Sequence, residues 1–234
     1  MVRRTKQEAQ ETRHRILDTA ETLFLRQGVS RTSLQQIADA AGLTRGAIYW
    51  HFEDKSQLFD AIMERATMPM EQGMGSQDTA PRDLSELRWG LVNIFFLTVN
   101  QERTHRAFEI SMHKVEYAGE LEGLRERKAS AHRDWRELTL RCLRHAQEQG
   151  QLEAQVDVAT AAVALVSLVD GLLHQWITEP EAFDLLAVGQ AAVQGFLDSL
   201  MPAGHNLPPM SAADRARLGQ LPLCPGQSSG KSPV

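Results

Sequence analysis

Residues able to do acid–base, metal or nucleophilic chemistry are few and scattered in this sequence. Helical spacing brings Glu109, His113 and Glu116 to one face, which would suit a metal ion, but ordinary surface charge pairing accounts for the same spacing. Neither a phosphate-binding P-loop nor a His-Glu-x-x-His zinc motif occurs. Cys142 and Cys224 are too far apart for a metal spacing or a disulfide framework, which fits a reducing cytosol. We therefore expect no enzyme activity, no metal and no cofactor.

One carboxylate stands out from this background. Asp170 interrupts a long apolar helical pattern, and burying a carboxylate is costly unless it is paired or hydrogen-bonded. One interpretation is an intrachain partner such as Arg141 or His174. The other is a polar anchor inside a hydrophobic ligand pocket. The residues alone leave both interpretations open.

A more specific pattern lies near the N-terminus. Two short helices joined by a tight turn need a small residue where they cross, here Ala38, and a residue that accepts positive φ, here Gly42. Ile37, Leu43 and Ile48 supply apolar side chains between the two helices. Small, glycine and β-branched residues at these offsets predict a helix-turn-helix.

Polar residues mark where these helices begin. Thr32 and Ser33 each precede a glutamine by three residues, so a capping box is available to the second helix. Thr44 is placed to cap the third helix, and Asp54 the fourth. Each capped N-terminus presents backbone N–H groups and a positive dipole end, which suit a DNA phosphate.

The third helix is expected to be the recognition helix in the major groove. Arg45 at its start can bind guanine O6 and N7, Gly46 allows close approach, and Tyr49 can touch a thymine methyl group or a phosphate. Hydroxyl, imidazole and ammonium groups around it suit phosphate. The predicted DNA contacts are Thr32, Ser33, Thr44, Arg45, Gly46, Tyr49, Trp50, His51 and Lys55.

Charge is distributed unevenly along the chain. Residues 1–55 carry 9 Lys and Arg against 7 Asp and Glu, whereas residues 56–234 carry 16 against 23. Arg3, Arg4 and Lys6 form a basic arm that can add phosphate or minor-groove contacts. The asymmetry is a modest indication of nucleic-acid contact at the N-terminal end.

Helical periodicity dominates the whole chain and predicts an all-α fold. We expect a helix-turn-helix domain over residues 1–66, a larger helical ligand-binding and dimerisation domain over 67–201, and a disordered tail rich in Pro, Gly and Ser over 202–234, apart from a helical turn near 211–218. The C-terminal domain is expected to contain helices near 83–100, 104–116, 120–149, 157–177 and 182–200. We found neither an apolar run of about 18 residues nor a secretory signal, so we expect a cytoplasmic protein with no membrane partner.

Two helices of the C-terminal domain are candidates for a homodimer interface. The pattern over 157–177 is apolar around most of its surface, which predicts burial on two sides. The stripe over 182–200 includes Gly189, which would allow close approach to another helix. Together they predict a four-helix interface between two subunits, with packing inside one chain as the alternative.

The same domain supplies candidates for a hydrophobic ligand pocket, although apolar stripes are as often plain core. Methionine and aromatic walls suit varied apolar ligands because they can repack. The predicted lining residues are Leu91, Ile94, Phe95, Thr98, Phe108, Ser111, Met112, Trp135, Leu138, Thr139, Cys142, Val166, Val169, Asp170 and Leu173.

The N-terminal pattern resembles a known family. The run from Thr44 to Phe52, followed by Lys55, is similar to the DNA-binding domain of TetR-family regulators. The sequence from Val2 to Phe52 is most similar to AcrR-like repressors of multidrug efflux pumps. The resemblance implies a homodimer of about nine helices per chain that binds operator DNA. It also implies a large apolar pocket, whose small hydrophobic effector releases the DNA. The C-terminal domain shares only the general pattern.

Two other functions remain open at this stage. Within the regulator class, the chain could control lipid or catabolic genes in response to an acyl or metabolite ligand. In a different class, it could be a protein-interaction module that keeps the fold without binding DNA. The operator, the effector, the regulated genes and the role of the tail cannot be read from the sequence.

Overall fold

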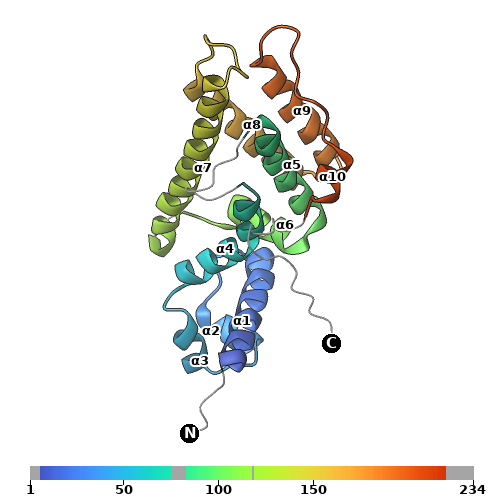
Figure 1. Ribbon diagram of the computed structural model, residues 1–234. Coiled ribbons are helices and arrows are strands. Elements are labelled where there is room, and N and C mark those ends of the chain that lie inside the picture. The colour runs from blue at the N-terminus through green and yellow to red at the C-terminus, as the bar shows by residue number, and fades with distance from the viewer. Residues whose placement is uncertain (1–5, 75–82, 118, 220–234) are drawn as a thin grey trace, which may run out of the picture. The chain divides into compact units, whose positions relative to one another are not determined.

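A computed structural model describes residues 6–74, 83–117 and 119–219, and over these residues the protein consists of helices joined by turns and loops, without a strand (Figure 1). The predicted all-α fold is confirmed. The helices are α1 (Lys6–Gln27), α2 (Leu34–Ala40), α3 (Arg45–His51), α4 (Lys55–Met74), α5 (Leu84–Asn100), α6 (Glu102–Glu109), the π-helix η1 (Ile110–Lys114), the 3-10 turn η2 (Gly119–Leu121), α7 (Glu122–Glu148), α8 (Val158–Thr178), α9 (Leu185–Ser199) and α10 (Ala212–Ala216).

The chain forms two compact units, each built from separated segments. The first unit combines residues 1–67 with 101–136 and 173–183, and the second combines 68–100, 137–172 and 184–234. The sequence predicts a single domain boundary near residue 66, but residues 101–136 and 173–183 also belong to the first unit. Ala107, Ile110, Leu121 and Leu124 are buried in the same cluster as the N-terminal helices. These side chains complete the core of the helix-turn-helix, because its own short helices are too small to form a complete core.

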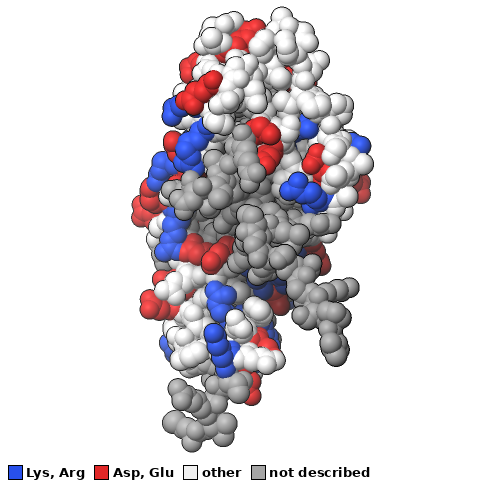
Figure 2. Space-filling model, in the orientation of Figure 1, with Lys and Arg blue, Asp and Glu red and all other residues white. Residues whose placement is uncertain are grey.

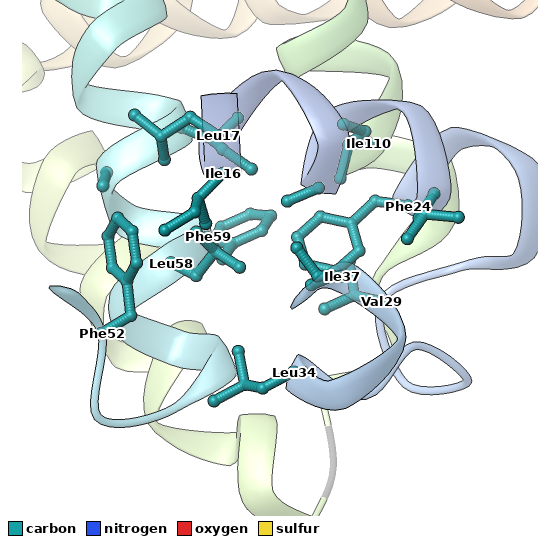
Figure 3. Packing of buried hydrophobic residues seen from close by; sticks show 14 of the residues in the cluster. Ile16, Leu17, Phe24, Val29, Leu34, Ile37, Phe52, Leu58, Phe59 and Ile110 are labelled. Carbon is teal, nitrogen blue, oxygen red and sulfur yellow. The ribbon is translucent and has the colours of Figure 1, made fainter. Parts of the chain in front are cut away.

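The core of the first unit surrounds the inner face of α1. Ile16, Leu17 and Phe24 are fully buried and meet Ile37 of α2 and Leu58 of α4 (Figure 3). Their spacing along α1 follows the apolar stripe that the sequence predicts. At about 1.5–3 kcal/mol for each large side chain removed from water, this cluster is the main force that orients α2 and α4 on α1.

A buried ion pair also ties α4 to α1. Arg65 pairs with Glu21 and, at 2.8 Å, with Asp18. Glu21 is only 3% exposed. Burial raises the pKa of its carboxyl, and the hydrogen bond from Arg65 opposes that shift.

The region expected to be one helix over 104–116 is divided in the structure. The α-helix ends at Glu109, the backbone continues as η1 to Lys114, and Glu116 follows the end of the helix. The proposed face of Glu109, His113 and Glu116 is therefore wrong, since its spacing assumed a continuous α-helix. No group of three or more His, Cys, Asp or Glu among the described residues is placed to hold a metal.

In the second unit, α5 packs against α9. The Phe95 ring lies so close to Gly189 that no Cβ would fit there. Gly189 does allow close approach to another helix, but that helix is α5 of the same chain, as in the alternative of packing inside one chain. Leu185, Val193 and Leu197 share this buried face of α9.

Helix α8 is buried along one side only. Leu165, Val166 and Val169 are buried, whereas Val163 is 51% exposed. By length and mean hydropathy α8 could cross a membrane, but a core helix of a water-soluble domain meets the same criterion.

The helical turn predicted near 211–218 is present as α10, whereas the disorder predicted for the rest of the tail differs from the structure over residues 203–210. Leu207 and Met210 are buried, and α10 begins at a capping box formed by Ser211 and Asp214. Composition indicated disorder because proline and glycine are frequent, but two apolar anchors and a capped helix are sufficient to dock the segment. Residues 220–234 lie outside the described part of the chain.

Candidate nucleic-acid interface

Helices α2 and α3 and the turn between them have the local structure that the sequence predicts. Ser33 caps α2, its hydroxyl accepting from Gln36 N at 3.1 Å and the Gln36 side chain accepting from Ser33 N at 2.8 Å. Gly42 turns the chain with φ of +64°. Thr44 then caps α3 by accepting from Ala47 N at 3.2 Å. These caps hold the two helices in a fixed register, as a DNA reader requires.

The side of α3 opposite its core residue is exposed and carries large side chains. Ile48 is fully buried, whereas Tyr49 is 45% and Trp50 72% exposed. Trp50 therefore does not belong to the core. Two large aromatic side chains are therefore exposed on one seven-residue helix, where they are available for contact with another molecule.

Arg45 is exposed at the start of this helix and is oriented by a neighbour. Its guanidinium lies 5.4 Å from the centre of the Tyr49 ring, one helical turn along. Cation–π contact of this kind restricts the arginine without neutralising it. Gly46 follows, and a Cβ at its position would meet nothing within 4 Å. The first turn of α3 therefore presents the Arg45 guanidinium, held beside Tyr49, next to Gly46, where no protein atom would obstruct an approaching molecule.

His51 lies at the other end of α3. It is half-buried, and its ring meets the Trp50 ring edge-on with centres 4.5 Å apart. The His51 ring is therefore packed against the Trp50 ring. The imidazole can serve phosphate only through the part of the ring that remains exposed.

Two predicted phosphate contacts are buried and committed to the protein backbone. Thr32 is 1% exposed and donates its hydroxyl proton to Gly28 O at 2.7 Å. Lys55 is 8% exposed and donates from Nζ to Val29 O at 3.2 Å and Ser30 O at 3.1 Å. The assignment of Thr32 and Lys55 as DNA contacts is wrong for this structure, because neither polar group is presented to solvent.

Lys55 instead contributes to a junction at the loop between α1 and α2. While Val29 O accepts from Lys55, Val29 N donates to Lys114 O, the last residue of η1, at 2.9 Å. A single residue is therefore linked through its N–H to the end of η1 and through its carbonyl to the first residue of α4. Sequence analysis missed Val29, because an apolar residue in a loop gives no sign that its backbone joins two helices.

Lys and Arg are interspersed with Asp and Glu on the face of the molecule drawn in Figure 2. The described residues on this face show no single-sign patch. Arg3 and Arg4 of the predicted basic arm lie outside the described residues, and Lys6 is exposed at the start of α1.

The predicted pocket residues are divided between the two units. Leu91, Ile94, Phe95, Thr98, Leu138, Thr139, Cys142, Val166, Val169 and Asp170 belong to the second unit, and Phe108, Ser111, Met112, Trp135 and Leu173 to the first. Apart from the half-buried Phe108, Ser111, Met112, Trp135 and Asp170, all are buried.

Two of these residues have defined contacts inside the second unit. Phe95 packs on Gly189. The Cys142 thiol lies 3.8 Å from Asp83 O, and burial raises its pKa to about 12. A thiol in that state is inert, so Cys142 is not a nucleophile.

Comparison with known families supports this assignment of the helices. A family model described as bacterial regulatory proteins, tetR family, matches residues 16–62. A second, described as MAATS-type transcriptional repressor, C-terminal region, matches residues 82–202.

Individual relatives cover most of the chain. The transcriptional regulator AcrR of Shigella flexneri is 42% identical over 187 residues, which are 79% of this chain and 87% of the relative. TtgR of Pseudomonas putida is 39% identical over 203 residues, covering 86% of this chain and 96% of TtgR.

Two solved structures are similar over the same extent. A complex of SmeT, the repressor of the Stenotrophomonas maltophilia efflux pump SmeDEF, with triclosan is 35% identical, with a TM-score of 0.75, over 86% of this chain and 96% of SmeT. NalD, the secondary repressor of the MexAB-OprM multidrug efflux pump in Pseudomonas aeruginosa, is 30% identical, with a TM-score of 0.73, over 85% of this chain and 100% of NalD.

Proposed function

The chain belongs to the TetR family of bacterial regulatory proteins, and from this premise we propose that it represses a multidrug efflux operon. Its relatives AcrR and TtgR are transcriptional regulators, and SmeT and NalD are repressors of efflux pumps. The observation that carries the proposal is the exposed face of α3, where Arg45 is stacked on Tyr49 beside the 72% exposed Trp50. This arrangement can read base edges in a major groove.

The operator contacts follow from what α2 and α3 expose. Arg45 supplies direct readout, most naturally of a guanine, and Tyr49 holds its guanidinium in place. The exposed N-caps of α2 and α3 add backbone N–H groups and hydroxyls for phosphate. The proposed contact set is Ser33, Thr44, Arg45, Gly46, Tyr49, Trp50 and His51.

The effector is proposed to be a small hydrophobic molecule bound in the C-terminal region. SmeT, a relative at 35% identity, has been solved with triclosan. The predicted pocket residues that belong to the second unit are the candidates for its lining in this chain. By linkage, an effector that prefers the arrangement unable to bind DNA weakens operator binding reciprocally. Regulation of lipid or catabolic genes by an acyl ligand is the alternative within this family.

A homodimer is proposed through the exposed sides of α8 and α9. Val163 and Val188 are 51% and 40% exposed, and both helices present small uncharged residues on the same sides. At Gly171 and Gly195 a Cβ would meet nothing within 4 Å. Small residues of this kind permit close helix approach, and a twofold dimer would space two copies of α3 about one DNA turn apart. We place this dimer in the cytoplasm, where the operator is.

The test is binding to DNA upstream of the protein's own gene, followed by fluorescence anisotropy. The Arg45→Ala variant should bind at least about 30-fold more weakly, since each of the two subunits of the proposed dimer loses a bidentate base contact worth about 1–3 kcal/mol. Arg144→Ala is the matched control, because Arg144 is an exposed arginine of α7 outside the proposed interface. Equal affinities for the two variants, or tight binding of a protein partner with no DNA binding, would refute the assignment.

A further inference from the structure

His113 and His174 are distant in the sequence but lie beside each other in the structure. Their ring centres are 5.4 Å apart, with the ring planes inclined by 47°. His113 belongs to η1 and His174 to α8, and both residues are exposed parts of the first compact unit. Single π-helical turns such as η1 occur frequently at functional sites. The sequence pattern placed His113 with Glu109 and Glu116, whereas the fold gives it a second imidazole as its neighbour.

The Thr178 hydroxyl fixes which nitrogen of the His113 ring carries the proton. This hydroxyl donates its one proton to the carbonyl oxygen of His174 at 2.8 Å. Towards His113 Nε2, which lies 3.3 Å away, the same oxygen can then only accept. The neutral His113 ring therefore carries its proton on Nε2 and its lone pair on Nδ1. Histidines that bind a metal ion are oriented in this way, with the second ring nitrogen donating to a neighbouring oxygen.

Both histidines lie close to the end of a helix. His113 is the last residue but one of η1, which ends at Lys114, and His174 lies four residues before the end of α8 at Thr178. The last carbonyl groups of a helix have no partner within it, and the aligned peptide dipoles give that end a partial negative charge. Glu109 and Lys114 pair with each other at 3.7 Å, so together they add no net charge beside His113. The two helix ends consequently favour a cation next to the imidazoles.

The spacing of the two rings fits a shared metal ion. Zinc binds imidazole nitrogen at about 2.0–2.1 Å with tetrahedral angles, so two imidazoles on one ion have their ring centres about 5 Å apart. The observed separation of 5.4 Å is close to this value. Since both residues are exposed, side-chain rotation can bring one nitrogen of each ring to the same ion. Neutral imidazole suits Zn²⁺, Cu²⁺ and Ni²⁺, whereas Mg²⁺ and Ca²⁺ prefer oxygen ligands.

We propose that His113 and His174 form a binding site for one divalent transition-metal ion, with Zn²⁺ as the reference ion. No third His, Cys, Asp or Glu among the described residues joins them, so water completes the coordination shell. The site differs from the face of Glu109, His113 and Glu116 rejected above, because its second ligand comes from α8. An ion held by both rings joins the end of η1 to α8 inside the first unit. Operator DNA and effector have no part in the site, so failure of the proposed function would leave it standing.

The experiment measures Zn²⁺ binding to the full chain by isothermal titration calorimetry, with Mg²⁺ as the control ion. His113→Ala and His174→Ala each remove one ring. His145→Ala is the matched control, because His145 is an exposed histidine of α7 in the second unit. Thr178→Val keeps the shape of the side chain but removes the acceptor for the His113 Nε2 proton. Circular dichroism and light scattering check that each variant keeps its fold and its oligomeric state.

The natural chain is expected to bind one Zn²⁺ at this site and no Mg²⁺. Thr178→Val should weaken Zn²⁺ binding about tenfold, the lower end of what loss of a hydrogen bond to a ligating histidine costs. His113→Ala and His174→Ala should weaken it more than this, because each removes a ligand outright, and His145→Ala should leave it unchanged. Electron paramagnetic resonance of the Cu²⁺ complex should show two nitrogen ligands in the natural chain and one in either of the two ligand variants.

Three results would count against the site. Absence of Zn²⁺ binding by the natural chain would overturn it, and so would equal affinities of the natural chain, His113→Ala and His174→Ala. An unchanged affinity in Thr178→Val alone would overturn the proton assignment on His113 and leave the two ligands in place. None of these measurements contains DNA, so they are decided separately from the test of operator binding.

Discussion

Helices α3 and α10 are alike in local structure and opposite in use. Both are short, seven and five residues, and both begin at a hydroxyl cap, Thr44 and Ser211. The recognition helix α3 buries Ile48 and exposes its aromatic side chains. Helix α10 buries none of its own residues. Its Asp214 carbonyl nevertheless accepts a hydrogen bond from Trp89 Nε1, and Arg217, the residue after the helix, lies over the Trp89 ring. A cap thus marks where a helix begins, whereas large exposed side chains on its outer face are available for contact with another molecule.

The largest expected effect separates the two faces of α3 itself. Ile48→Ala should lower the free energy of unfolding by about 2–5 kcal/mol, because the deleted atoms leave a cavity in the core. Trp50→Ala should change it by less than about 0.5 kcal/mol, since the side chain is exposed. Urea unfolding of both variants measures the contrast. Similar losses in the two would mean that Trp50 packs in the core after all.

Lys55 provides the next contrast, between a structural cation and a DNA contact. Lys55→Met keeps the apolar stem but leaves two loop carbonyls without their donor, and should cost about 1–3 kcal/mol of stability. Operator binding should weaken while the slope of log affinity against log salt stays unchanged. If Lys55 bound phosphate, the slope would instead fall by about 0.9 for the lost contact. Arg45→Ala is the reference for a residue at the DNA surface.

A smaller effect is expected where α10 meets α5. Trp89→Phe keeps a buried aromatic ring but removes the N–H that donates to Asp214 O, and should cost about 1 kcal/mol. Thermal unfolding against Trp50→Phe, at an exposed position, tests this expectation. A loss no larger than that of Trp50→Phe would show that α10 does not depend on this hydrogen bond.

The smallest effect concerns acid stability of the α10 cap. The Ser211 hydroxyl donates to Asp214 at 2.7 Å and holds the pKa of that carboxyl below its ordinary value of 3.8. A depressed carboxyl pKa gives stability that is present above the unfolded value and is lost as pH falls through the folded value. The difference in melting temperature between the natural chain and Ser211→Ala should therefore be constant above about pH 5 and shrink below pH 4. A difference independent of pH would contradict the role of the Asp214 carboxylate.

Sequence reasoning succeeded where the physical cause is local. The caps at Ser33, Thr44 and Asp54 and the turn at Gly42 were predicted and are present. Each depends on one side chain and a backbone only a few residues away. The exposed face of α3 also follows from the periodicity around Ile48.

Expectations that depended on distant contacts were less successful. Lys55 and Thr32 carry groups typical of phosphate contacts, but in the fold both are buried and donate to backbone carbonyls of the loop between α1 and α2. Gly189 suggested a subunit contact, and the structure places Phe95 of its own chain there. The π-helix η1 could not be distinguished from continued α-helix by periodicity over so few residues.

By itself the sequence determined an all-helical protein, the capped reader at α2 and α3, and the residues that α3 can present to DNA. These features arise from intrinsic propensity and from spacing within one or two helical turns. Tertiary structure alone decided that Lys55 donates to the loop carbonyls of Val29 and Ser30, that α6, η1 and part of α7 complete the N-terminal core, and that residues 203–219 dock on α5. Those outcomes depend on which surfaces meet when segments a hundred residues apart are brought together, and no local pattern encodes that choice.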